Sequence, residues 1–159
     1  MENKVGGRIV REGEGKHDRR LADSPGDDSI RQLLASPRVV AIVGMSPKLD
    51  RPSRTVGLYL SRQGFTVIPI HPVAEQVAGL RAYPNLDAIP REARVEIVDV
   101  CVAAERAGPV ADQAARIGAR MIWFQPGAEN PAAEKRARQL GLQVISGRCM
   151  MADYRHLIG

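Results

Sequence analysis

Residues 39–60 read VVAIVGMSPKLDRPSRTVGLYL, and this stretch decides the fold. It opens with a run of β-branched and small apolar residues, 39–43, which predicts a strand covered on both faces. The run ends at Gly44, where the backbone can approach a ligand closely. A polar loop follows, and Pro52 is typical of the first turn of a helix. The stretch therefore predicts a strand, a glycine-containing loop and a helix.

The loop and the helix after it offer several hydrogen-bond donors to an anion. A helix that begins near Pro52 presents free backbone N–H groups and the positive end of its dipole. Side-chain donors surround this point, and we expect them to contact phosphate: Ser46, Lys48, Arg51, Ser53 and Arg54. The segment is thus predicted to bind a phosphate-containing ligand.

A pattern of helix, glycine and apolar strand recurs three times after this unit. Gly64 precedes FTVIPI, Gly118 precedes ARMIWF and Gly141 precedes LQVIS. Glycine just beyond a helix can adopt the left-handed conformation that ends it, so the chain turns directly into a strand. A further apolar run, VEIVDVCV at 95–102, precedes a helix expected around 105–117. Strands that alternate with helices predict an α/β fold, a doubly wound (Rossmann-like) parallel sheet of about five strands with helices on both faces.

Shorter elements complete the expected fold. Asp28 or Ser29 can cap a helix that runs to about Ala35. The connection between the second and third strands is predicted to be loop and single turns, with a short helix over 85–89. Residues 152–158 predict a last helix, because their apolar positions are three to four apart.

One domain is expected from a chain of 159 residues that is 44% hydrophobic. Residues 1–28 mix both charges with glycine and lack a sustained period, which predicts a mobile charged N-terminal arm before a domain at 29–159. The net charge of +5 comes from the domain, because residues 1–28 hold six Lys/Arg against seven Asp/Glu. Such a balance attracts polyanions. With only three Tyr, two Phe and one Trp, however, nucleic acid is not the expected ligand.

The sequence predicts a cytoplasmic protein. No apolar run approaches the roughly 20 residues of a membrane span, and the N-terminus lacks the apolar centre of a signal peptide. Cys101 and Cys149 are too few for a disulfide scaffold and are expected to stay reduced. Their spacing from the three histidines does not match a metal-ligand motif, so no metal site is predicted.

The carboxyl ends of the predicted strands define where a ligand binds, because open parallel sheets hold ligands where the strand order reverses. A dinucleotide fold would show GxGxxG in the first loop and an acidic residue after the second strand. Here the first loop reads GMSPK and the second strand ends at His71 and Pro72. The GxxxxGK[ST] motif of ATP sites is also absent. Of the nucleotide ligands considered, the one that still fits is a long nucleotide held by serines, arginines and helix N–H groups.

The segment GMSPKLDRPSRTV, with the later IPIHP, VDVCV, MIWFQPGAEN and GRC, resembles the small CoA-binding proteins. These proteins are related to the CoA-binding Rossmann-type domain at the N-terminus of the succinyl-CoA synthetase α subunit, and the resemblance covers about 29–157. It implies that the domain binds CoA or acyl-CoA, and the first hypothesis is a binding module without chemistry of its own. It also implies contacts to phosphate by Gly44, Ser46, Arg51, Pro52 and Ser53, to adenosine by His71 and Pro72, and to pantetheine by Val102, Gln125 and Gly127.

Two other functions remain open from the sequence. One is a subunit of an ADP-forming acyl-CoA synthetase that is inactive without its companion chains, and the other is an NAD(P)- or nucleotide-sensing regulator. His71 fits either a ring beside the base or a cap of the neighbouring loop. Cys149 fits either a packed thiol or one that meets the CoA thiol in a mixed disulfide. The oligomeric state is open, with a homodimer as the common default.

Overall fold

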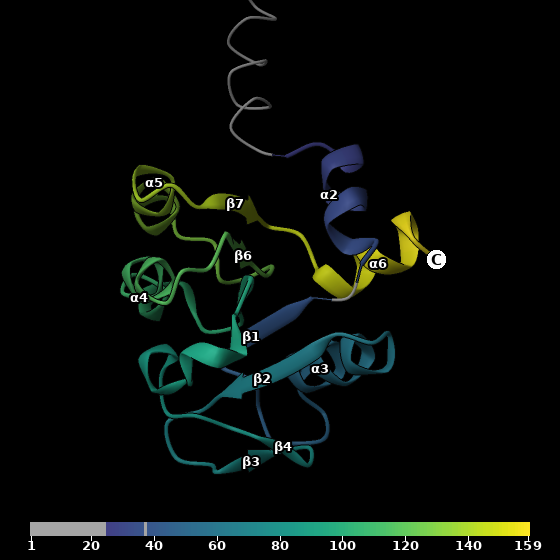
Figure 1. Ribbon diagram of the computed structural model, residues 1–159, viewed down its shortest axis with the longest axis vertical. Helices are drawn as coiled ribbons and strands as arrows, with labels where there is room; N and C mark the ends of the chain where they lie inside the picture. Colours follow the sequence, from purple (N-terminus) through teal and green to yellow (C-terminus); the bar gives the residue numbers. More distant parts are fainter. Residues whose placement is uncertain (1–24, 37) are drawn as a thin grey trace, which may run out of the picture.

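The computed structural model describes residues 25–36 and 38–159 (Figure 1). Most of the N-terminal arm predicted over 1–28 lies outside these residues. Its last two residues belong to the first turn of helix α2, which spans Asp27–Leu34. The folded domain therefore includes two residues that the prediction assigned to the arm.

The start of α2 differs from the prediction. Gly26 is the N-cap of the helix, and no side chain accepts a hydrogen bond from its first turn. The predicted cap at Asp28 or Ser29 is therefore wrong. Asp28 instead pairs with Arg31 one turn later, with 2.6 Å between the carboxylate oxygen and the guanidinium nitrogen.

Five parallel strands form the central sheet, in the order β2-β1-β5-β6-β7 (Figure 1). The order reverses between β1 and β5, because the chain first adds β2 on one side of β1 and then returns to add the later strands on the other. The predicted doubly wound α/β sheet is confirmed. The strands are β1 (Val39–Val43), β2 (Thr66–Ile70), β5 (Ile97–Val100), β6 (Met121–Phe124) and β7 (Gln143–Ser146).

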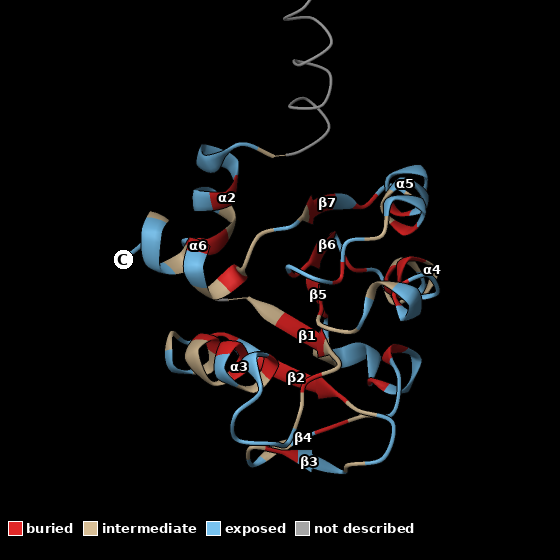
Figure 2. Ribbon diagram, turned by 180° about the vertical axis from the view of Figure 1, so that it is seen from behind, coloured by how far each residue is buried: buried red, intermediate tan, exposed pale blue. Residues whose placement is uncertain are grey.

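Helices cover both faces of the sheet (Figures 1 and 2). Helices α2, α3 and α6 share one hydrophobic cluster with the sheet, and α4 and α5 share the other. Figure 2 shows that each helix buries the side that faces the sheet. Helix α6 begins at Met150, earlier than the predicted residue 152. The bounds of the other helices are α3 (Pro52–Arg62), α4 (Val110–Arg116), α5 (Pro131–Gln139) and α6 (Met150–Leu157).

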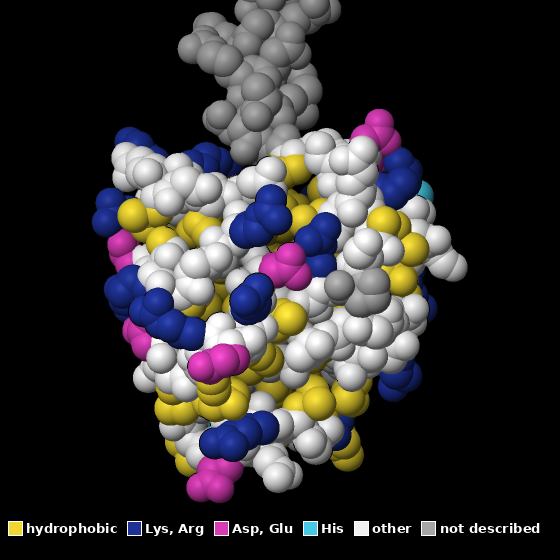
Figure 3. Space-filling view, viewed as in Figure 1, with side chains coloured by type: hydrophobic (Ala, Val, Ile, Leu, Met, Phe, Trp, Pro, Cys, Tyr) yellow, Lys and Arg dark blue, Asp and Glu magenta, His cyan; other side chains and the backbone are white. Residues whose placement is uncertain are grey.

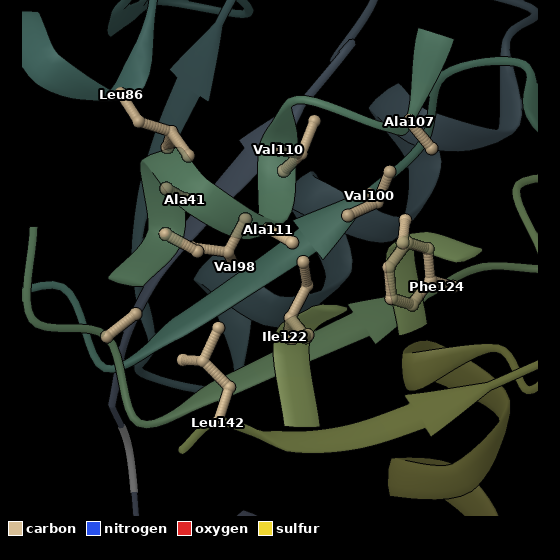
Figure 4. Packing of buried hydrophobic residues seen from close by; sticks show 14 of the residues in the cluster. Ala41, Leu86, Val98, Val100, Ala107, Val110, Ala111, Ile122, Phe124 and Leu142 are labelled. Atoms are coloured by element: carbon tan, nitrogen blue, oxygen red, sulfur yellow. The ribbon is translucent and has the colours of Figure 1, made fainter. Parts of the chain in front are cut away.

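The two faces of the sheet carry separate hydrophobic clusters. Val98 and Val100 of β5 belong to the cluster with α4 and α5, whereas Ile97 belongs to the cluster with α2, α3 and α6. Figure 4 shows the first cluster, where Val98 of β5 and Ile122 of β6 lie close to Ala111 of α4. Because both faces are covered, the strands are nearly continuously apolar, which explains why apolar runs predicted them.

Glycine ends three helices as predicted. Gly64, Gly118 and Gly141 follow α3, α4 and α5 and have φ angles of +96°, +81° and +90°. An L-amino acid with a side chain rarely adopts this conformation. Each glycine lets the chain reverse directly into the next strand, and that strand runs parallel to the one before the helix.

The helix predicted around 105–117 is shorter than expected. A single 3-10 turn, η3, covers Ala104–Arg106, and α4 begins only at Val110. Pro109 is the N-cap of α4 rather than a residue of its first turn. Proline lacks the N–H that would continue the helical hydrogen bonds from η3, so the helix starts anew after it.

The connection between β2 and β5 holds an antiparallel hairpin that was not predicted. Strands β3 (Gln76–Val77) and β4 (Leu80–Arg81) pair around Ala78 and Gly79, whose φ angles are +54° and +80°. Two successive residues with positive φ are typical of a type I′ turn, whose usual sequence is Asn-Gly or Asp-Gly. The turn was not predicted because alanine occupies its first position. The single turns that we expected in this connection are η1 (Leu86–Ala88) and η2 (Arg91–Ala93).

Candidate functional site

Two adjoining cavities open at the carboxyl edge of the sheet, where the topology predicts a ligand. The first has a volume of about 820 Å³ and lies between the loop after β1, the start of α3 and the segments after β5, β6 and β7. The second, of about 400 Å³, adjoins the ends of β1 and β2. Because the cavities share wall residues, they form one extended site. The shared residues are Gly44, Ser46, Cys101, Val102 and Arg106.

Gly44 brings the first loop against the end of the neighbouring strand. Its φ is +88°, and a Cβ atom there would lie 2.7 Å from Cγ1 of Val102 and 3.1 Å from the carbonyl oxygen of Cys101. Both distances are shorter than ordinary van der Waals contact, and glycine is the residue that avoids them. The loop can therefore lie directly over the end of β5, at the point where the strand order reverses.

Ser46 and Ser53 hold the loop against the start of α3. The Oγ of Ser53 accepts a hydrogen bond from the backbone N–H of Ser46 at 3.0 Å, and the Oγ of Ser46 accepts one from the N–H of Lys48 at 3.1 Å. Each hydroxyl thus acts as an acceptor within the loop and keeps its own proton for a ligand. Both serines line the first cavity. The loop is preorganised to donate hydroxyl protons to an anion.

The N-terminus of α3 adjoins the first cavity. Its N-cap is Arg51, no side chain caps the first turn, and that turn contains no acidic residue. The helix dipole therefore favours negative charge here without an internal carboxylate to satisfy it. Lys48 and Arg51 line the same cavity, as does one carboxylate, that of Asp50. The balance of charge around the loop is positive.

His71 lies at the end of β2 and lines the second cavity with Pro72. Its Nδ1 accepts hydrogen bonds from the backbone N–H groups of Val73 and Ala74, at 3.1 and 2.9 Å. An accepting Nδ1 in a neutral ring puts the proton on Nε2. Of the two interpretations that the sequence left open, the structure shows the loop cap, and the ring lies in the wall of the cavity.

Gln125 and Gly127 line the first cavity, but their polar groups are used within the protein. Gln125 is 8% exposed; its Oε1 accepts a hydrogen bond from the N–H of Met150 at 2.9 Å, and its Nε2 lies 3.6 Å from Sγ of Cys149. The N–H of Gly127 donates to Oε1 of Glu129 at 2.7 Å. These residues shape the cavity wall, and Gln125 also fixes the start of α6.

Arg54 differs from the other predicted contact residues, because it lines neither cavity. It is half-buried on α3, and its Nε has no hydrogen-bond partner among the described residues. The fold brings the other predicted residues together at one edge of the sheet. Those in the first cavity are Gly44, Ser46, Lys48, Arg51, Pro52, Ser53, Val102, Gln125 and Gly127, and those in the second include His71 and Pro72.

A family model described as "CoA binding domain" matches residues 38–155. The chain belongs to this family. The matched range begins just before β1 and ends within α6, so both cavities lie inside the CoA-binding domain. The family resemblance recognised in the sequence is confirmed.

Similar proteins share most of the length of this CoA-binding domain. "Uncharacterized protein YneT" of Bacillus subtilis (strain 168) is 28% identical over 127 residues, which cover 80% of this chain and 93% of that protein. The solved structure of a hypothetical protein from Pyrococcus horikoshii OT3 is 36% identical, with a TM-score of 0.82 over 86% of this chain and 95% of that one. The dinucleotide forming acetyl-coenzyme A synthetase 1 of Ca. Korarchaeum cryptofilum has 22% identity and a TM-score of 0.61 over 74% of this chain and 27% of its own. The similarity to the synthetase shows that the two proteins share a fold.

The CoA-binding domain also brings to the site residues that were not predicted. Arg106, on η3, lines both cavities and adds a positive charge at their junction. Arg106 comes shortly after the end of β5, and this position could have predicted its place at the site. The prediction of a regular helix from residue 105 led us to overlook it. Cys101 and Met151 line the first cavity as well, together with Cys149, for which the sequence had left a position beside the CoA thiol open.

A buried acid lies on the central strand β5, next to the cavity. Asp99 is fully buried; its Oδ2 accepts a weak hydrogen bond from the Cys101 thiol at 3.8 Å, and its Oδ1 has no partner among the described residues. Burial raises the pKa of Asp99 to about 8, and the hydrogen bond from Cys101 opposes this shift. The carboxyl group is therefore mostly protonated at neutral pH. Burial, and then the neighbouring Asp99, raise the pKa of the Cys101 thiol.

Within residues 25–36 and 38–159, no group of three or more His, Cys, Asp or Glu side chains is placed to hold a metal ion. None of the helices in the same residues has the length and hydrophobicity of a membrane span.

On the face shown in Figure 3, Lys and Arg side chains are spread among acidic and apolar ones. Proteins that track a nucleic-acid backbone instead gather such side chains along one face.

Proposed function

We propose that this domain binds coenzyme A, free or acylated, and acts as a non-catalytic binding module. The observation that carries the proposal is the start of α3, where the hydroxyl protons of Ser46 and Ser53 and an uncapped helix N-terminus meet at one cavity. A phosphate placed there receives hydrogen bonds from the hydroxyls and charge-assisted bonds from Lys48 and Arg51. Membership of the CoA-binding domain family supports the same ligand.

The two connected cavities suit the separate parts of such a ligand. In this proposal the adenosine lies in the second cavity beside His71 and Pro72, and the phosphates lie over the loop after β1. The pantetheine arm then follows Val102 toward the ends of β6 and β7 along the first cavity. Arg106, in the wall of both cavities, stands where the phosphates would pass from one to the other.

Two alternatives make different demands. The first alternative, a subunit of an ADP-forming acyl-CoA synthetase, is supported only by the fold shared with the Korarchaeum synthetase. If the protein copurified with a partner chain and with acyl-CoA synthetase activity, this alternative would replace our proposal.

The second alternative, an NAD(P)-sensing regulator, needs an acidic or basic residue for the ribose at the end of the second strand. Here β2 ends at Ile70 and is followed by His71 and Pro72.

Ligand ranking by thermal shift tests the proposed function. A ligand that binds only the folded state raises stability by RT ln(1 + [L]/Kd), so at equal concentration the tightest ligand gives the largest shift. We expect CoA to give a larger shift than dephospho-CoA, NAD, NADP or ATP. A larger shift with NAD or ATP would contradict the proposal. Light scattering on the same samples measures the oligomeric state, for which a homodimer is the common default.

Replacing Arg51 with alanine is expected to raise the Kd for CoA about tenfold or more, because it removes a charge-assisted bond to phosphate at the helix N-terminus. Isothermal titration calorimetry measures the change. The matched control is Arg120→Ala, since Arg120 is also exposed but precedes β6 at the opposite edge of the sheet. Equal affinities of the Arg51 and Arg120 variants would remove Arg51 from the site.

Arg106 allows a test that the sequence alone did not suggest. Because Arg106 lines both cavities, we expect Arg106→Ala to weaken CoA binding roughly tenfold. The same titration, with Arg120→Ala again as the control, measures the loss. If the Arg106 variant binds CoA like the wild type, the phosphates do not cross the junction between the cavities.

A further inference from the structure

Two thiols line the first cavity. Cys101 comes directly after β5, and Cys149 is the N-cap of α6; both are free and half-buried. The hydroxyls of Ser46 and Ser53 and the N-terminus of α3 belong to the same cavity. A ligand that carries both phosphate and sulfur can therefore engage both kinds of group at once, and CoA is such a ligand.

Cys149 is held in a defined position by Gln125. The Nε2 of Gln125 lies 3.6 Å from the sulfur of Cys149, and its Oε1 accepts the N–H of the next residue, Met150, at 2.9 Å. Gln125 is itself buried at the end of β6, so its amide has little freedom to move. The sulfur is thus fixed against a rigid strand end while it faces the cavity.

Arg148 precedes Cys149 in the sequence, but its side chain is engaged elsewhere. Its guanidinium binds both carboxylate oxygens of Asp153 at 2.9 and 3.0 Å and a carboxylate oxygen of Asp27 at 2.9 Å. An interaction between Arg148 and the thiol, which the sequence order suggests, is therefore not what the structure shows. Cys149 itself is the N-cap of α6, at the end of the helix where the dipole favours negative charge.

Cys101 has a different environment, although it lines the same cavity. Its thiol donates to the buried carboxyl of Asp99 at 3.8 Å. Burial first, and Asp99 second, raise the pKa of this thiol. Because the thiolate is the reactive form of cysteine, the raised pKa of Cys101 disfavours it as the attacking group.

We propose that Cys149 undergoes thiol–disulfide exchange with oxidised CoA and holds the coenzyme as a mixed disulfide. This inference rests on the proposed CoA site. In this step the Cys149 thiolate attacks one sulfur of CoA disulfide, the sulfur–sulfur bond of that molecule breaks, and one CoA leaves as a thiolate. The leaving thiolate takes up the proton that Cys149 releases. One disulfide is consumed and one is formed, so no other oxidant is needed.

Recognition of the phosphates gives this reaction its selectivity. When Ser46, Ser53 and Arg51 hold the phosphates of CoA disulfide, the disulfide is confined near Cys149 and the attack becomes effectively intramolecular. Glutathione disulfide has the same reactive bond but no phosphate for the loop to bind. We therefore expect modification of Cys149 by CoA disulfide to be at least about tenfold faster than by glutathione disulfide at equal concentration.

The test incubates the full-length reduced protein with CoA disulfide or glutathione disulfide and follows intact mass over time. The expected product carries one CoA, less the hydrogens lost from the two thiols, and dithiothreitol removes it. Peptide mapping locates the adduct, with Cys101 as the internal comparison in the same molecule. Cys149→Ser should form no adduct, and Arg51→Ala should slow the reaction with CoA disulfide by a larger factor than the reaction with glutathione disulfide.

Calorimetry with reduced CoA separates this inference from the proposed function. If CoA binds but no adduct forms at Cys149, the mixed disulfide is wrong and the binding function stands. Equal rates with the two disulfides, or an adduct on Cys101 alone, would also overturn the inference, because Cys149 would then be an ordinary accessible thiol. Absence of CoA binding would overturn both.

Discussion

Replacing Gly44 with alanine is expected to destabilise the domain by about 2–6 kcal/mol and to abolish measurable CoA binding. Two costs add. A residue with a side chain at φ +88° is strained by roughly 1–3 kcal/mol. The new Cβ would also lie 2.7 Å from Cγ1 of Val102 and 3.1 Å from the carbonyl oxygen of Cys101, and overpacking of this kind costs roughly 1–3 kcal/mol.

The neighbours of Gly44 cannot move aside cheaply. Valine is branched at Cβ and has few rotamers, and the carbonyl of Cys101 belongs to the end of the central strand. The loop must therefore shift, which moves Ser46 away from Ser53 and breaks the 3.0 Å hydrogen bond between them. Because that bond orients the phosphate donors, affinity is lost together with stability.

Gly118→Ala is the matched control for Gly44→Ala. Gly118 has a similar φ of +81°, but a Cβ atom there would meet nothing within 4 Å. Urea unfolding of both variants thus separates backbone strain from the clash. Adding Val102→Ala to the Gly44 variant should recover part of its stability. Equal losses in the two glycine variants would show that the close approach to β5 contributes nothing.

The fold could be predicted from the sequence because its signals are local. Strands buried on both faces are apolar runs, and glycines 64, 118 and 141 mark the ends of helices without reference to distant residues. The hairpin over 76–81 was missed for the same reason. Its turn places Ala78 at a φ of +54°, and alanine carries no local signal for that conformation.

The candidate site was predictable to the extent that it follows from topology. The ends of parallel strands meet at one edge, so residues as distant as Ser46 and Gln125 were expected together. What each side chain does there depends on packing. Two loop N–H groups engage Nδ1 of His71, and Arg148 turns to Asp27, 121 residues away. The His71 contact is local and was one of the two interpretations that the sequence left open, whereas the contact between Arg148 and Asp27 joins distant segments and could not be predicted from neighbouring residues.

The position that most clearly breaks the sequence pattern is Asp99, an acid in the middle of an apolar strand. It occupies a site where its neighbours across the sheet are Ile42 and Trp123. The carboxyl is fully buried, with Oδ1 unpaired among the described residues. Polar groups buried in this way cost stability, and natural proteins tolerate such costs mainly near functional sites. Cys101, to which Asp99 is bonded, lines both cavities.

Asp99→Asn is expected to stabilise the protein at alkaline pH and to remove a pH dependence. In the unfolded chain the carboxyl ionises near its ordinary pKa of 3.8, whereas in the folded protein burial raises the pKa to about 8. Between these values the unfolded state releases a proton that the folded state keeps. The free energy of unfolding of the wild type therefore falls as pH rises from about 4 to about 8, by up to about 1.4 kcal/mol per pH unit from this group.

Asparagine resembles the protonated acid in shape and cannot ionise, so the two proteins should be nearly equal in stability near pH 4. At about pH 8 the variant should be more stable, by on the order of 5 kcal/mol, which is a large share of a typical domain's stability. Urea unfolding at a series of pH values measures the difference. Asp87→Asn is a control of opposite sign, because a hydrogen bond from Arg116 lowers the pKa of the exposed Asp87 and its contribution is lost as pH falls. A constant difference between Asp99→Asn and the wild type across the series would mean that Asp99 is already ionised in the folded protein, despite its burial.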